Sequence, residues 1–68
     1  MPKRAIQLGD CFQRSGNPYS TWEVERLFEY EDLPPHARLI ERGSRRVVTV
    51  AVSVLYDDRQ FKFIPPEQ

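Results

Sequence analysis

The sequence contains little of the chemistry from which catalytic, metal-binding or disulfide sites are built. Its 68 residues include one cysteine and one histidine. A single cysteine cannot close a disulfide within the chain, and small secreted domains usually depend on such bonds. The donors Cys11, His36, Asp57 and Asp58 also lack the paired spacing of metal ligands. We therefore expect a protein that is not an enzyme and that uses no metal or cofactor.

The surroundings of the cysteine and the histidine do not favour catalysis. Cys11 follows Asp10, and a neighbouring negative charge disfavours the reactive thiolate. His36 follows two prolines at the expected exit of a loop, where a solvated histidine is commoner than a general base. We expect Cys11 to serve as a small apolar strand residue and His36 to be solvated.

The chain also lacks a long apolar segment and an excess of either charge. Its longest uncharged apolar run, residues 47–56, is much shorter than the roughly 20 residues of a membrane-spanning helix. Lys3, Arg4 and Asp10 leave no room for the apolar centre of a signal peptide. Ten basic and ten acidic residues cancel, so the whole molecule attracts nucleic acid or anionic membrane weakly. We expect a cytoplasmic protein that does not bind a membrane.

What the chain does contain is a series of short segments in which apolar residues alternate with polar ones. Clusters of glycine, proline, asparagine and serine separate these segments, a pattern that predicts β-strands joined by turns. No internal repeat or domain boundary interrupts the series. The expected strands cover residues 5–14, 21–30, 36–42, 46–52 and 61–64.

Local signals refine the first three strands. Gly9 and Asp10 should bend the first strand at its middle. In the second strand the alternation slips after Val24, which predicts a β-bulge at Glu25-Arg26. The two prolines at 34 and 35 remove backbone donors and should exclude a central strand there.

The second half of the chain carries two more local signals. Gly43 suits the positive φ of a tight hairpin turn. Ser53 should cap a single helical turn before the last strand. Because so short a chain buries a limited share of its surface, its large apolar residues are needed inside. The expected core is Leu8, Phe12, Trp22, Val24, Leu27, Leu39, Val50, Val52 and Leu55.

The order of these elements resembles the SH3-like barrels, including small bacterial proteins of that fold. The resemblance rests on Leu8-Gly9-Asp10-x-Phe12, on Trp22-x-Val24-x-x-Leu27, and on the valine-rich fourth strand that runs into "SVLYDD". It implies an all-β fold with one domain over residues 1–68: a small five-stranded barrel, a helical turn before the last strand, and flexible ends at 1–4 and 65–68. SH3-like barrels bind peptides, modified side chains, RNA or larger assemblies, and the resemblance implies that range.

Aromatic residues outside the expected core are candidates for a binding surface. After the bulge, Phe28 and Tyr30 cannot both follow Leu27 inward, so at least one should reach an outer face. Tyrosines in the loop at 19 and the helical turn at 56 suit interfaces, because they combine apolar area with a hydroxyl. The alternative is that each tyrosine covers one end of the core. We expect protein binding, to another protein or to a second copy, through exposed members of Tyr19, Phe28, Tyr30 and Tyr56.

Charge is arranged in two blocks. Residues 23–32 hold five acidic residues and one arginine, whereas residues 38–46 hold four arginines and one glutamate. We favour opposite charges paired across neighbouring strands, which would help to set their register. The alternative is a nucleic-acid-binding hairpin, because arginine binds phosphate with two parallel hydrogen bonds. Its residues would be Arg38, Arg42, Arg45 and Arg46.

Overall fold

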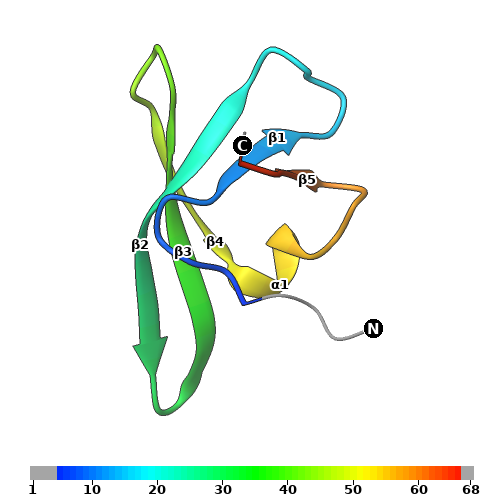
Figure 1. The fold of residues 1–68 in the computed structure, drawn as a ribbon. Helices are drawn as coiled ribbons and strands as arrows, with labels where there is room; N and C mark the ends of the chain where they lie inside the picture. The colour runs from blue at the N-terminus through cyan, green and yellow to red at the C-terminus, as the bar shows by residue number, and fades with distance from the viewer. Residues whose placement is uncertain (1–4, 67–68) are drawn as a thin grey trace.

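The structure is a computed structural model that describes residues 5–66, and its main element is a five-stranded antiparallel sheet (Figure 1). The order across the sheet is β4-β3-β2-β1-β5. The predicted all-β class is confirmed, with one short helix beside the sheet. The elements are β1 (Cys11–Arg14), β2 (Thr21–Tyr30), β3 (Leu33–Glu41), β4 (Val47–Ala51), α1 (Val52–Leu55) and β5 (Phe61–Ile64).

The sheet is open, because β4 and β5 form its two edges and do not pair with each other. β2 is the longest strand: its first half pairs with β1, and β3 follows it over nearly its whole length. The helix α1 contacts β3, β4 and β5, so it lies where the two edges of the sheet approach (Figure 1). A closed barrel is therefore not confirmed, whereas the short helix before the last strand is.

Two irregularities interrupt the pairing of β2 with β3. Val24 pairs with Leu39, but Arg26 pairs with Arg38, so Glu25 is an extra residue on β2. The predicted β-bulge is confirmed. Further along, Pro34 and Pro35 lie between consecutive paired positions on β3, opposite one residue of β2.

The expectation of a loop at the two prolines is wrong, since β3 begins before them. The expectation that they exclude a central strand is confirmed, because only β2 pairs with β3 in this region. The pairing of β3 with β4 starts only at His36, so both prolines lie where β3 has a neighbour on one side. They also occupy the second bulge. Edges and bulges are the places where a sheet tolerates a residue without a backbone donor.

The first strand is shorter than predicted, because the chain turns at residues 7–10 instead of continuing as a strand. Gly9 has a φ of 89°, and the Asp10 carboxylate accepts a hydrogen bond from the Gln7 amide at 2.9 Å. The turn is fixed to β2 by two backbone bonds to Val24. Leu8 is 63% exposed, so its prediction as a core residue is wrong: the turn reorients its side chain.

Of the two local predictions for the second half of the chain, the turn at Gly43 is confirmed and the helix cap at Ser53 is wrong. Gly43 has the expected positive φ, 92°. Ser53, however, lies inside α1, where the N-cap position belongs to Ala51 and no side chain caps the helix. The helix therefore begins two residues earlier than predicted, at Val52.

The core lies on the concave side of the sheet and is closed by α1. Three residues expected in it, Leu27, Val50 and Val52, are half-buried and pack against it. Two buried members, Ala37 and Phe61, were not predicted. The buried apolar residues are Phe12, Trp22, Val24, Ala37, Leu39, Leu55 and Phe61.

The ends of the chain complete this description. The predicted flexible ends fall on 1–4 and 67–68, which lie outside the described residues, and on Pro65 and Pro66, which follow β5 without regular secondary structure. Within residues 5–66, no helix has the length and apolar character needed to cross a membrane.

Candidate functional site

The β2–β3 hairpin ends in three apolar side chains, which we call the hairpin tip: Phe28, Tyr30 and Leu33. Tyr30 and Leu33 pair across the hairpin and are 60% and 58% exposed. The ring of Phe28 stacks on that of Tyr30, with centroids 6.5 Å apart and planes 11° from parallel. Alternation explains the arrangement, since residues two apart in a strand share a face and Leu27, which directly precedes Phe28, faces the core. The prediction that at least one of the two aromatics points outward is confirmed.

A pocket of about 190 Å³ lies beside the tip and is lined by Phe28 and Tyr56. The two residues come from β2 and from the end of α1, and the packing of α1 against the sheet brings them together. Three of the four predicted contact residues therefore meet in one region. The fourth, Tyr19, is 94% exposed in the β1–β2 loop, at the opposite end of β2; Figure 1 shows that this loop and the tip point in opposite directions.

Three carboxylates lie next to the tip in the sequence. Glu31 and Asp32 are in the turn between Tyr30 and Leu33, whereas Glu29 is on the opposite face of β2 from Phe28 and Tyr30. Glu29, Glu31 and Asp32 are all exposed. None of these three carboxylates makes a hydrogen bond or an ion pair within residues 5–66. The tip therefore presents apolar surface bordered at the turn by a negative rim, Glu31 and Asp32.

The two charge blocks meet across β2 and β3. The Arg38 Nε lies 3.5 Å from Glu25 Oε1, and the Arg42 Nη2 lies 3.3 Å from Glu23 Oε1. All four side chains are well exposed, so each pair stabilises the fold weakly. The expected cross-strand pairing is confirmed for these two arginines.

The other two arginines of the block do not pair with β2. The Arg46 Nε donates to Glu41 Oε1 on the neighbouring strand β3, at 2.9 Å. Arg45 adopts a φ of 63° in the turn, and its guanidinium has no ion pair among the described residues. Only this one of the four predicted nucleic-acid residues lacks a carboxylate partner within residues 5–66.

Glu41, at the end of β3, is the one buried charged residue among residues 5–66, with 8% of it exposed. Besides the bond from Arg46, its carboxylate accepts hydrogen bonds from the hydroxyls of Ser44 and Ser20. The bond from Arg46, followed by those from Ser44 and Ser20, lowers the pKa of Glu41 from 4.5 to about 2. The cluster ties the β1–β2 loop to the β3–β4 hairpin. The sequence carried a signal for it: Glu41 continues the alternation of Ala37 and Leu39, so it faces inward.

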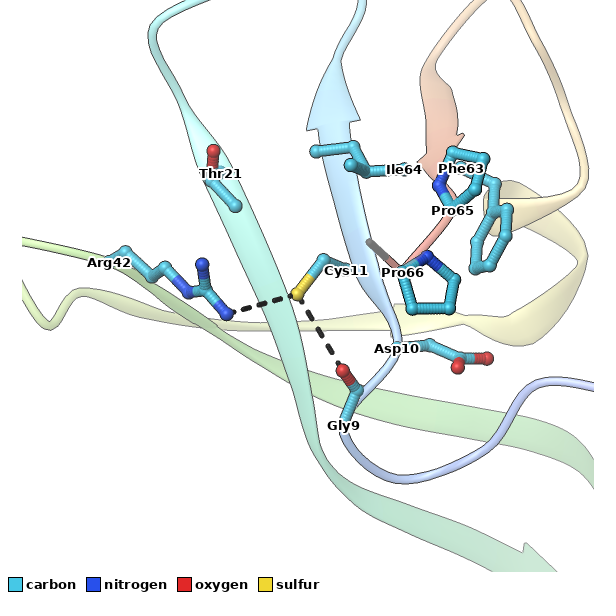
Figure 2. Close-up of a pocket in the computed structure, with 9 residues that line it drawn as sticks. All are labelled: Gly9, Asp10, Cys11, Thr21, Arg42, Phe63, Ile64, Pro65 and Pro66. Carbon is cyan, nitrogen blue, oxygen red and sulfur yellow. Dashed lines mark hydrogen bonds between the residues drawn. The ribbon is translucent and has the colours of Figure 1, made fainter. Parts of the chain in front are cut away.

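A second pocket, of about 440 Å³, lies at the start of β1 and contains the cysteine. Figure 2 shows the Arg42 guanidinium directed at Cys11, with Nη2 donating to Sγ at 3.4 Å. The thiol in turn donates to the Gly9 carbonyl oxygen at 3.6 Å. Cys11 lies in a strand, as expected, but its surroundings are not purely apolar, because the end of the β2–β3 hairpin brings Arg42, 31 positions away, to its side.

The histidine differs from expectation as well. His36 is half-buried in β3, and its Nδ1 lies 2.7 Å from the Pro34 carbonyl oxygen. No group of three or more histidine, cysteine, aspartate or glutamate side chains within residues 5–66 is placed to hold a metal ion.

Comparisons with known proteins add no family to this description. No family model matches the chain, and searches of curated proteins and of solved structures found no significant match.

Proposed function

We propose that this protein is a small, non-enzymatic binding or assembly module that contacts another protein through the hairpin tip. The observation that carries the proposal is the stacked pair Phe28 and Tyr30, held beside an exposed Leu33 at the end of a hairpin. Aromatic side chains are enriched at protein interfaces and dominate binding energies there. Neighbouring exposed apolar residues at a projecting end are more informative than scattered ones.

The rim of carboxylates defines the partner's chemistry. Glu31 and Asp32, in the turn between Tyr30 and Leu33, would border whatever covers the tip. A partner with an apolar groove bordered by lysine or arginine would complement both the rings and the rim. The pocket beside Phe28 and Tyr56 would receive an apolar side chain from that partner.

We also propose that the open sheet is an SH3-like barrel of a bacterial cytoplasmic protein. The strand order β4-β3-β2-β1-β5 and the short helix before β5 support the fold. The edge strands β4 and β5 do not pair through their backbones. The helix α1 contacts both of them and so fills the gap between the two edges. Bacterial origin and compartment follow from the resemblance and composition described above.

The proposed contact predicts that tip and loop tyrosines behave differently. A photo-reactive residue at position 30 should cross-link one main partner in the host cell, whereas the same residue at position 19 should not. With that partner purified, the double change Tyr30→Ser and Leu33→Ser should weaken binding by about 30-fold, because loss of an interface hot spot costs about 2 kcal/mol. Titration by calorimetry measures the change.

Tyr19→Ser is the matched control for this experiment, because Tyr19 is even more exposed but lies at the other end of β2. It should leave the dissociation constant unchanged. Equal losses from both variants, or the same cross-linked products from both positions, would contradict the proposal.

The alternative function is nucleic-acid binding by the arginine hairpin. The unpaired Arg45 favours it, but Arg38, Arg42 and Arg46 already have carboxylate partners. A phosphate would have to displace those carboxylates. The geometry therefore supports a structural role for this block more than a phosphate site.

One variant separates the two roles of the arginines. Replacing Arg42, Arg45 and Arg46 with glutamine should lower the melting temperature. The exposed Arg42–Glu23 pair stabilises the fold by only about 0 to 1 kcal/mol, but the buried Glu41 also loses its charged donor. Filter binding over a salt series should give no difference from the unmodified protein. Unchanged stability together with lost RNA or DNA affinity and a flatter salt dependence would establish the phosphate site instead.

A further inference from the structure

The two edges of the sheet differ in how they are protected against pairing with another strand. On β5, the sequence FKFI places Lys62 within the strand, and Pro65 and Pro66 follow directly. Lysine and proline are the residues with which natural proteins block an exposed edge. This edge is therefore protected.

The β4 edge has none of these features. Its sequence VVTVA contains no charge, no proline and no glycine, and β-branched residues fill four of its five positions. It pairs with β3 at five consecutive positions without a register shift, so no bulge twists it away. Among residues 5–66, no strand lies on its other side. Its outward backbone groups are a template for a further strand.

From this contrast we infer that the protein self-associates as a two-fold dimer through antiparallel pairing of β4 with β4 of a second copy. An isologous interface requires the two edges to run antiparallel. Pairing centred on Thr49 uses all five residues: Thr49 lies opposite Thr49, Val48 opposite Val50, and Val47 opposite Ala51. This interface is separate from the hairpin tip, so it does not depend on the proposed function.

The side chains on both faces suit this register. Val48 and Val50 pack against the core in each copy, so pairing would continue the apolar face of one sheet into the next. On the other face, Thr49 is exposed and Val47 is 43% exposed. Threonine opposite threonine is a favourable cross-strand pair, and the pairing would cover Val47.

Nearby charges do not oppose the dimer. Arg38 lies next to the edge as the partner of Thr49, and Arg46 precedes β4. Each of them has a carboxylate within its own copy, Glu25 and Glu41 respectively. Two copies therefore meet without bringing uncompensated positive charges together.

Sedimentation of the full chain over a range of concentrations tests the inference. We expect a monomer–dimer equilibrium, and Thr49→Lys should weaken it by at least about tenfold, since like charges directly opposite each other destabilise a strand pair. Thr49 is exposed, so the variant should keep its fold, which circular dichroism verifies. Tyr19→Lys adds the same charge at an exposed position outside the β4 edge. It should leave the dissociation constant of the dimer unchanged, as should Tyr30→Ser at the tip.

Cross-linking provides a second, independent measurement. In a Cys11→Ser background, Thr49→Cys should form an intermolecular disulfide with oxidised glutathione, because opposite residues of an antiparallel pair have Cα atoms about 4.5 to 5.5 Å apart. Val47→Cys, on the same face, should react much more slowly, since the two copies of position 47 would be separated by about 13 Å along the strands.

Three results would overturn the inference. One is a monomer at every concentration. The β4 edge would then be free to pair with an extended peptide of another protein rather than with a second copy. Another is a dimer that Thr49→Lys does not weaken. The third is equal cross-linking at positions 47 and 49. None of these results bears on the hairpin tip, whose test uses a different partner and different variants.

Discussion

Replacing Trp22 with alanine is expected to lower the free energy of unfolding by about 3 to 5 kcal/mol. The Trp22 side chain is 3% exposed on β2, where it belongs to the buried cluster with Phe12 and Leu39. A core in a chain of this size supplies only about 3 to 5 kcal/mol in total. The variant should therefore be largely unfolded at room temperature. Urea denaturation followed by far-UV circular dichroism measures the effect without relying on tryptophan fluorescence.

Two further variants make this result interpretable. Trp22→Phe should cost less than the alanine change, because it keeps an aromatic ring and removes an indole N–H that is buried without a hydrogen-bond partner among the described residues. Tyr19→Ala, at a fully exposed ring, should change stability by no more than about 0.5 kcal/mol. A folded Trp22→Ala protein with an unchanged urea midpoint would show that the ring is not part of the core.

The second large effect is expected at Glu41, as a dependence of stability on pH. Glu41 has a pKa of about 2 in the folded protein, against an ordinary value of 4.5, because Arg46, Ser44 and Ser20 donate to its charged form. The folded state thus binds this proton less readily than the unfolded state does. The stabilisation is fully present above pH 4.5 and is lost as the pH falls toward 2.

Glu41→Gln isolates this contribution. The glutamine keeps the shape of the side chain but removes the charge, so the variant should melt at a lower temperature than the unmodified protein at pH 7. The difference should shrink between pH 4.5 and 2, where the glutamate itself becomes protonated. Thermal denaturation over pH 2 to 7 measures both proteins.

Glu31→Gln is the matched control, because Glu31 is exposed at the β2–β3 turn and makes no ion pair among residues 5–66. Its melting temperature should follow that of the unmodified protein at every pH. A Glu41→Gln difference that stays constant from pH 7 to pH 2 would contradict the assignment of the low pKa to this cluster.

Features that depend on neighbouring residues could be predicted from the sequence. The slip in alternation after Val24 predicted the bulge at Glu25, because a two-residue period leaves no other way to keep both Val24 and Leu27 inside. Gly43 predicted a turn with positive φ. The last strand was predicted at the residues where it is found, 61–64. In each case the deciding interaction lies within a few residues of the signal.

The candidate contact surface could be predicted only in part. The bulge predicted that Phe28 and Tyr30 cannot both follow Leu27 inward, because side chains alternate between the two faces of a strand. It did not predict which of the two is exposed, and the structure shows that Tyr30 is. The position of Tyr56 next to Phe28 could not be predicted from the sequence, because the packing of α1 against the sheet brings the two residues to the same pocket. The sequence also could not show that Tyr19 lies apart from the other three candidates, at the other end of β2. The aromatic residues could thus be identified as candidates from the sequence, but only the tertiary packing shows which of them lie together.

The sequence by itself determined the strands, the bulge and the placement of most core residues, because backbone geometry and side-chain alternation are local properties. Tertiary structure decided the surroundings of Leu8, Cys11 and Glu41. Leu8 is exposed because the turn before β1 is fixed to Val24 of β2. Cys11 meets Arg42, and Glu41 meets Ser20, because antiparallel pairing joins residues far apart in the chain. Such partners depend on strand order, which no single segment encodes.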